Sequence, residues 1–272
     1  MIGSISCGRD HTLALLGDGK VLGWGGDGSG RIPASGTEYC TTSKASAPSV
    51  EVNLTQRLVA VSAGYGISLG ITAQAQVVVW GATAAGIGGR LDSVALARPQ
   101  AIAGIVNASA IAGGEFLFGA IDTAGTIFTW GLNADGALGR PTTQFNAGPG
   151  PIEALPAASA LALGKGFVVA LTLGGDLYAW GSNAAGQLGL GHLLSAGKPQ
   201  RLRAPAEFRS VAAGATHALA VTTDDEVIAW GSNHHGQLGH QSPAYSSVPL
   251  PVELPERARS VAPDTRSALR SL

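Results

Sequence analysis

The residues best suited to chemistry in this sequence are histidines, and three of the six lie close together near the C-terminal end. This group is His234, His235 and His240, and His192 or His217 would complete a set of four ligands. Imidazole nitrogen is a common ligand of zinc and other transition metals. Taken alone, the grouping would predict a metal site.

The sequence around this group argues for a different interpretation, because nearly the same string occurs fifty residues earlier. There, Ala184 and Ala185 hold the positions of His234 and His235. A position that accepts alanine in a neighbouring copy is best explained as part of a surface turn. We therefore predict that these histidines are solvated loop residues and that they bind no metal.

A second pair, His11 and His217, occupies another repeated position, which holds isoleucine, leucine or phenylalanine in the other copies. A position that accepts these apolar residues is a packing position. We predict a structural role for both histidines, with one ring nitrogen hydrogen-bonded to the backbone.

No other motif for catalysis stands out from the repeat. The sequence has no phosphate-binding loop of the Gly-x-x-x-x-Gly-Lys-Ser type and no local nucleophile–histidine or paired-carboxylate motif. The glycine-rich stretch from Gly23 to Gly30 continues a predicted strand with no helix after it, which disfavours a dinucleotide site. Cys7 lies in a predicted inner strand, where a buried, inert thiol is expected. We expect no catalytic residue, no cofactor and no metal.

The elements that must position any site come from the repeat itself. The stretch Tyr178–Gly189 returns almost unchanged as Ile228–Gly239, and looser copies surround three earlier tryptophans. The five repeat tryptophans are spaced 56, 50, 50 and 50 residues apart and are Trp24, Trp80, Trp130, Trp180 and Trp230.

Glycine recurs at fixed offsets from each tryptophan. One set lies sixteen residues before it, at Gly8, Gly64, Gly114, Gly164 and Gly214. A second set follows it directly, at Gly25, Gly81, Gly131, Gly181 and Gly231. A third lies six residues after it, at Gly30, Gly86, Gly136, Gly186 and Gly236. Such positions require either a positive φ angle or a place where no side chain fits.

Strand signals fill the space between these glycines. In the last full copy, Ser210–Ala213, His217–Thr222 and Val227–Trp230 read as three short strands, with a turn before the third. A fourth strand should precede each next unit, near 98–102, 150–153, 198–202 and 250–254, where proline suits an edge strand. Four short strands per unit of about fifty residues, without helical periodicity, predict the blades of an all-β propeller. The tryptophans should pack between neighbouring blades.

Composition and charge exclude several classes of protein. The chain has 272 residues, of which 45% are hydrophobic and 13% charged, so it can bury a large core. A net charge of −1 gives no electrostatic footprint for nucleic acid or an anionic membrane. No apolar run is long enough to span a bilayer, and Met1–Ser4 lacks the features of a signal peptide. We expect a cytoplasmic protein in a reducing compartment, and the alanine and arginine content is consistent with a GC-rich bacterial genome.

The repeat resembles that of a known family. The pattern Gly-x-x-His-x-Leu-Ala, a turn, and Val-x-x-Trp-Gly-x-Asn-x-x-Gly-Gln-Leu-Gly is similar to the regulator of chromosome condensation (RCC1-like) repeat family. The similarity covers essentially the whole chain and is strongest in Gly214–Gly239, Gly164–Gly189 and Gly8–Gly25. It implies a propeller of four-stranded blades, which in the family number seven, and it implies guanine-nucleotide exchange on a Ran-like small GTPase as one activity.

The repeat count departs from that family. We predict one propeller domain over 1–272 with units at 1–54, 55–106, 107–156, 157–206 and 207–256 and a partial sixth at 257–272. Ser260–Leu269 is in register with Ser210–Leu219, but no tryptophan follows. The propeller would then be smaller or open, or have lost blades, or be completed by a second chain. Open sheet edges at Ile2–Cys7 and Ser260–Leu272 would permit self-association.

The first unit also holds six additional residues, which fall within Arg31–Val50. Propellers carry function on such loops, so we take Glu38, Tyr39 and Lys44 as candidate binding residues. Further candidates for partner contact are aromatic residues, namely Phe116, Phe145, Phe167, Phe208 and Tyr245.

The function predicted from these observations is that of a non-catalytic scaffold for protein–protein interaction. The alternative is a guanine-nucleotide exchange factor for a Ran-like GTPase, for which the Arg31–Val50 insertion would have to act as the wedge. Nucleic-acid binding is not expected, because the arginines of the last third of the chain are interleaved with acidic residues. No membrane partner is expected either.

Overall fold

The computed structural model of the chain describes the following residues: 1–26, 32, 49–81, 96–153, 155–204, 206–240, 244–254 and 261. The predicted candidates Glu38, Tyr39 and Lys44 lie outside these residues, as does most of the predicted sixth unit. No helix among the described residues is long and apolar enough to cross a membrane.

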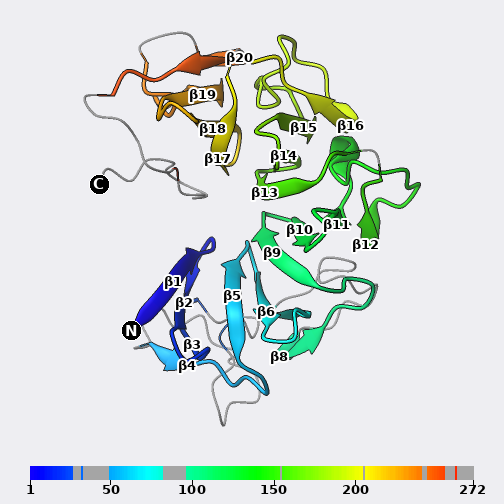
Figure 1. Cartoon of the computed structure of the whole chain (residues 1–272), viewed down its shortest axis with the longest axis vertical. Coiled ribbons are helices and arrows are strands. Elements are labelled where there is room, and N and C mark those ends of the chain that lie inside the picture. The colour runs from blue at the N-terminus through cyan, green and yellow to red at the C-terminus, as the bar shows by residue number, and fades with distance from the viewer. Residues whose placement is uncertain are drawn as a thin grey trace. The chain divides into compact units, whose positions relative to one another are not determined.

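Within the described residues, the fold consists of five four-stranded antiparallel sheets, or blades, in which consecutive strands pair (Figure 1). Blade 1 contains β1 (Ile2–Cys7), β2 (His11–Leu16), β3 (Val21–Gly25) and β4 (Val50–Glu51). Blade 2 contains β5 (Leu58–Ala63), β6 (Ile67–Thr72), β7 (Val77–Gly81) and β8 (Leu96–Ala101). Blade 3 contains β9 (Ala108–Gly113), β10 (Leu117–Asp122), β11 (Ile127–Leu132) and β12 (Asn146–Pro151).

Blade 4 contains β13 (Ala158–Leu163), β14 (Phe167–Thr172), β15 (Leu177–Gly181) and β16 (Ala196–Arg201). Blade 5 contains β17 (Phe208–Ala213), β18 (His217–Thr222), β19 (Val227–Ser232) and β20 (Tyr245–Pro251). A short 3₁₀ helix, η1 (Ala134–Gly136), follows β11. The predicted all-β propeller of four-stranded blades is thus confirmed. Two fourth strands begin earlier than predicted, because β12 and β20 start at Asn146 and Tyr245 instead of near 150 and 250.

The chain divides into two compact units, which are described separately here. The first unit comprises Met1–Thr123, Phe128–Leu132 and Asn146–Gly150, and so holds blades 1 and 2 and most of blade 3. The second comprises Ala124–Ile127, Asn133–Phe145 and Pro151–Leu272, and so holds blades 4 and 5 and the connection between β11 and β12.

Within each unit, the core lies between successive blades. In the second unit, Phe208, Val211 and Ala213 on one face of β17 pack against the core of blade 4. In the first unit, β5 packs against blade 1 in the same way, through Leu58 and Ala63. Within each unit, a blade therefore buries the face of the blade before it, as expected for repeats that cannot form a core alone.

Three repeat tryptophans, Trp80, Trp130 and Trp230, belong to these core clusters between blades, as predicted. Trp80, Trp130, Trp180 and Trp230 are fully buried. Trp180 Nε1 donates to the carbonyl of Ala137 (2.9 Å), and Trp230 Nε1 donates to the carbonyl of Gln187 (2.9 Å). Both acceptors belong to the connection between the third and fourth strands of the preceding blade. Each of these two indoles thus fills the interface and ties it to the preceding loop.

Glycine is required at the recurring positions for two different structural reasons. The glycines directly after the tryptophans all have positive φ, between 100° and 109°, and a Cβ on Gly181 would lie 2.3 Å from the carbonyl oxygen of Gly166. The upstream glycines are not in this conformation, but a Cβ on Gly164 would lie 1.8 Å from the ring of Phe167. The first set is required by the backbone and the second by the ring packed on it.

The outer strands carry proline where pairing with another chain would occur. In β16, Leu202 N donates to Leu177 O just beyond the strand, and Gln200 pairs with Ala179. By alternation, Pro199 is directed away from the sheet, where its missing N–H removes a donor from the exposed edge. This confirms the prediction that the fourth strand is an edge strand.

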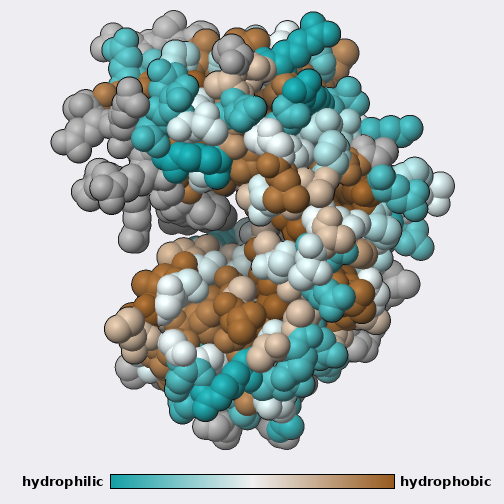
Figure 2. Space-filling view, viewed as in Figure 1, coloured by the Kyte–Doolittle hydropathy of each residue, from teal (hydrophilic) through white to brown (hydrophobic). Residues whose placement is uncertain are grey.

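Blade 1 differs from the other blades on one face. Ile2 and Ile5 of β1 are 56% and 54% exposed, Cys7 is exposed, and Trp24 is only half-buried. Figure 2 shows apolar surface over the region of β1 and β5 in this unit. The prediction of a buried Cys7 was wrong, because the equivalent Ala63 is buried only through packing on the preceding blade. Self-association through this segment and Ser260–Leu272 stays a prediction.

One described residue belongs to the predicted sixth unit. Val261 is buried in a cluster with Leu219, Val221 and Val227 of blade 5. Val211, the equivalent residue one repeat earlier, packs in the same way on blade 4, in a cluster with Leu171 and Leu177. The predicted sixth unit and the register of Ser260–Leu269 on Ser210–Leu219 stay predictions.

The interface tryptophans give the first testable prediction. We expect Trp180→Ala to lower the free energy of unfolding by about 3–5 kcal/mol, because it leaves a cavity and an unpaired carbonyl between blades. Trp24→Ala is the matched control and should cost clearly less, because Trp24 is only half-buried. Urea unfolding of both variants measures this, and equal, small losses would show that the tryptophans do not hold the blades together.

Candidate functional site

The polar residues of the repeat motif are used inside the loops and are not available to a ligand. Asn183 is fully buried, and its Oδ1 accepts from Leu188 N (3.0 Å). Its Nδ2 donates to the carbonyls of His192 (2.8 Å) and Leu194 (3.0 Å). Gln187 Oε1 accepts from Ala185 N (2.9 Å). These bonds fix the connection between β15 and β16 from within.

The same arrangement recurs in the neighbouring blades. Asn233 Oδ1 accepts from Leu238 N (3.0 Å), and Asn233 Nδ2 donates to His240 O (3.1 Å). In blade 3, Asn133 Oδ1 accepts from Leu138 N (3.1 Å). Three connections of the second unit, 133–145, 182–195 and the described part of the third, 233–240, therefore share this asparagine-centred bond. We call the end of the blades that carries them the loop end.

Large apolar side chains are exposed on the loop end. Phe145 is 69% exposed, Leu194 is 73% exposed, and Leu193 and Tyr245 are each 41% exposed. Leu194 has its backbone held on both sides, because its N–H donates to His192 Nδ1 (3.2 Å) and its carbonyl accepts from Asn183. Its side chain is thus presented outward from a fixed backbone, and exposed apolar side chains of this kind mark contact surfaces.

The predicted aromatic candidates therefore divide. Phe145 and Tyr245 lie exposed on the loop end. Phe167 and Phe208 are buried in the core between blades 4 and 5, so these two candidates are core residues, the more common role of an aromatic side chain, and not contact residues. Sequence reasoning missed Leu193 and Leu194, although two adjacent leucines in a polar connection were a signal that could have found them.

Phe116 lies in a different cluster, in the first unit. The Tyr65 and Phe116 rings have centroids 5.0 Å apart, and the Arg9 guanidinium lies 4.2 Å above the Tyr65 ring. These residues come from the turns between the first and second strands of blades 1, 2 and 3, and all three are at least partly exposed. The cluster is a cation–π and aromatic contact that links successive blades.

The histidines occupy two environments. His234 and His235 are exposed on a turn of the loop end, as predicted, and His192 is held by the loop hydrogen bonds. No three histidine, cysteine or carboxylate side chains of the described residues come together as metal ligands would.

His11 and His217 are buried, as predicted. His11 Nε2 lies 3.0 Å from Ser68 Oγ of blade 2, so the bond is to a side chain and not to the backbone as expected. His217 packs its ring on Gly214, and its Nε2 has no hydrogen-bond partner among the described residues. Burial lowers the pKa of His217, which favours the neutral imidazole.

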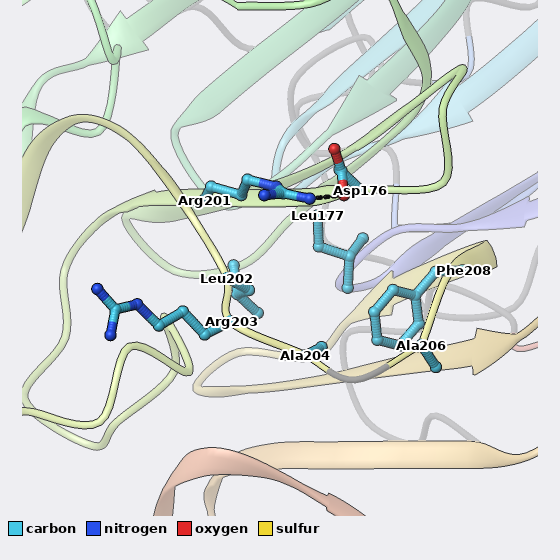
Figure 3. Close-up of a pocket in the computed structure, with 8 residues that line it drawn as sticks. All are labelled: Asp176, Leu177, Arg201, Leu202, Arg203, Ala204, Ala206 and Phe208. Carbon is cyan, nitrogen blue, oxygen red and sulfur yellow. Dashed lines mark hydrogen bonds and ion pairs between the residues drawn. The ribbon is translucent and has the colours of Figure 1, made fainter.

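The opposite end of the blades in the second unit, which we call the turn end, carries the hairpin turns 173–176 and 223–226 and the connection 202–207. Charged side chains there are largely paired. Arg201 bonds to Asp176 (2.6 Å) and Arg209 to Asp225 (2.5 Å). These pairs account for two of the arginines that the sequence shows among acidic residues. A pocket of about 540 Å³ lies beside the first pair (Figure 3).

Comparisons with known proteins agree with this architecture. A family model for the RCC1-like domain matches residues 1–265. No curated protein matches the sequence at a significant level.

Solved structures give the same result. Human WBSCR16 superposes with a TM-score of 0.86 at 22% identity, covering 96% of this chain and 69% of that one. Yeast RCC1 (Prp20), solved bound to Kap60, gives 0.83 at 22% identity, with coverages of 96% and 66%. Prp20p from Saccharomyces cerevisiae, described with its binding properties to Gsp1p and histones, gives 0.78 at 19%, with coverages of 93% and 64%. The chain spans about two thirds of these proteins, and at such identities the likeness shows the fold.

The buried His217 predicts a pH dependence of stability. An unfolded histidine titrates near pH 6.5. Because burial lowers the pKa of His217 in the folded protein, only the unfolded chain takes up this proton just below that pH. The free energy of unfolding should therefore fall as the pH drops below about 6.5. His217→Phe, which copies Phe167 of blade 4, should reduce this fall.

The measurement is the thermal midpoint of each protein at pH 8 and pH 5. His234→Ala is the control, because this exposed histidine should change stability by less than about 0.5 kcal/mol at either pH. An unchanged pH dependence in His217→Phe would contradict the assignment.

Proposed function

The chain belongs to the family of RCC1-like domains, and on that premise we propose that it is a non-catalytic scaffold that binds protein partners through the loop end of its second unit. The observation that carries the proposal is the exposure of Phe145, Leu194 and Tyr245 at the loop end, where the backbone of Leu194 is held on both sides by hydrogen bonds.

The rigidity of these connections supports binding on energetic grounds. A loop that is already ordered loses little conformational freedom on association, so more of the energy of apolar burial appears as affinity. Asn183 supplies this order in blade 4, and Asn233 supplies it in blade 5. The exposed aromatic and leucine side chains are of the kinds that anchor protein interfaces.

The proposal predicts that the loop end and not the turn end carries the partner. We expect a Phe145→Ser, Leu194→Ser, Tyr245→Ser triple variant to lose the proteins that wild-type chain captures from extracts of its source cells. Leu173→Ser is the matched control: Leu173 is 73% exposed, as Leu194 is, but lies on a hairpin turn at the turn end of the same blade.

Quantitative mass spectrometry of the captured proteins measures this, with thermal unfolding as the check that both variants fold. Exposed substitutions of this kind usually change stability by less than about 0.5 kcal/mol. A captured set that is the same for the triple variant and the wild type would contradict the proposal.

Guanine-nucleotide exchange is the second candidate, because two of the similar structures are of yeast Prp20, one of them described with its binding to Gsp1p. An exchange factor must bind the nucleotide-free GTPase more tightly than the loaded one. The insertion proposed for that role, Arg31–Val50, lies almost entirely outside the described residues.

The two candidates differ in one measurable rate. For the scaffold, we expect the release of fluorescent GDP from Ran to be unchanged when this chain is added, because no chemistry or wedge is assigned to the loop end. EDTA, which removes Mg²⁺ from the GTPase, is the positive control for release. If this chain accelerated GDP release, and the acceleration saturated with the concentration of the chain, the scaffold proposal would be contradicted and guanine-nucleotide exchange supported.

A further inference from the structure

The pocket of Figure 3 lies at the turn end of the second unit, away from the loop end on which the proposed function rests. Its floor is formed by Leu177, Leu202 and Phe208, which belong to the core between blades 4 and 5. Its rim is formed by Asp176, Arg201 and Arg203. The pocket thus combines an apolar base with charged groups at its mouth, which is the usual composition of a ligand site.

The charges on this rim do not cancel. Arg201 bonds to Asp176 across β15 and β16 (2.6 Å), and this pair is drawn in Figure 3. Arg203 is exposed, and Figure 3 shows its guanidinium extending away from that pair. No ion pair to Arg203 is found within the part of the chain that the structure describes. The charged side chains among the residues that line the pocket therefore sum to one positive charge, and the guanidinium donors of Arg203 are not used in an ion pair within the described residues.

An equivalent groove lies between blades 1 and 2 and serves as a comparison within the same chain. There, Lys20 and Glu51 take the positions of Asp176 and Arg201, with the charges exchanged and the ion pair kept (3.0 Å). Arg57, the other cation of that groove, lies 3.7 Å from Asp18. The groove is smaller, about 220 Å³, and Asn53 holds the position of Arg203. The repeat therefore produces the groove, but not the unpaired arginine.

From these observations we propose that the pocket beside Arg203 binds a peptide carboxylate next to a small apolar side chain. The carboxylate would accept hydrogen bonds from the Arg203 guanidinium, which matches the planar, two-oxygen geometry of that group. The apolar side chain would lie against the base formed by Leu177 and Leu202. A single unpaired guanidinium beside an apolar base suits one carboxylate better than a polyanion such as nucleic acid.

The experiment uses three small probes on the whole chain. N-acetyl-leucine carries a terminal carboxylate, N-acetyl-aspartyl-leucinamide carries a side-chain carboxylate, and N-acetyl-leucinamide carries neither. We expect saturable NMR shifts of the Leu177 and Leu202 methyl groups and the Arg203 amide with either or both of the carboxylates, at millimolar concentration, and none with the neutral amide. The first probe alone would identify a chain terminus as the ligand, and the second alone an internal acidic residue.

The variant Arg203→Gln should weaken carboxylate binding about tenfold while the protein stays folded, because a charged hydrogen bond is lost at an exposed position. Arg57→Gln in the equivalent groove is the matched control and should leave binding unchanged. Equal shifts with the neutral amide, binding that Arg203→Gln does not weaken, or no saturable shift with any probe would each overturn the proposal. None of these outcomes concerns the loop end, so the carboxylate-binding proposal can be contradicted while the scaffold proposal stands, and the reverse.

Discussion

The contact between the tryptophan of one blade and the loop of the blade before it is the constraint on which this structure depends. In blades 4 and 5, the indole is fully buried and its N–H reaches a carbonyl of the preceding connection, at Ala137 or Gln187. In these two blades, the preceding connection presents its carbonyl to that N–H from the same position of the repeat. The two carbonyls lie fifty residues apart, as the two tryptophans do, so in this part of the chain a unit shapes a loop for its neighbour as well as folding its own sheet.

This constraint determines which residues are left for function. Asn183 and Gln187 would look suited to binding in the sequence, but both are buried and hydrogen-bonded within the loop that receives Trp230. The positions free to vary are those between the fixed ones, such as Leu194 and His234. In a repeat protein, the residues by which the copies differ are therefore better guides to the binding surface than those by which they agree.

Much of the fold could be predicted from the sequence, because its signals are local to each unit. The glycine after each tryptophan, the hairpin turns and the proline of the outer strand all reflect backbone conformation within one blade. The errors concern packing between blades. Cys7 and Ala63 occupy equivalent positions, yet only Ala63 is buried. The burial of a side chain at this position depends on the neighbouring blade that packs against it and not on the strand that carries it.

The candidate sites were harder to predict for the same reason. The pair of Asp176 and Arg201 joins residues 25 positions apart, so the unpaired state of Arg203 could not be seen from charges interleaved along the chain. Phe167 and Phe208 lie in strands β14 and β17 and are buried between blades 4 and 5, whereas Phe145 lies in the connection before β12 and is exposed. The predicted insertion residues, Glu38, Tyr39 and Lys44, lie outside the described residues and stay predictions.

The shifted pKa values among the described residues arise from packing and ion pairing. Catalytic groups need a pKa shifted toward their task and a reacting partner within reach. The shifted groups here have structural causes: His217 is desolvated against Gly214, and Arg201 is held charged by Asp176. Arg140 has its pKa lowered by burial in the connection that receives Trp180. Each of these shifts therefore reports how the side chain is packed or paired in its blade.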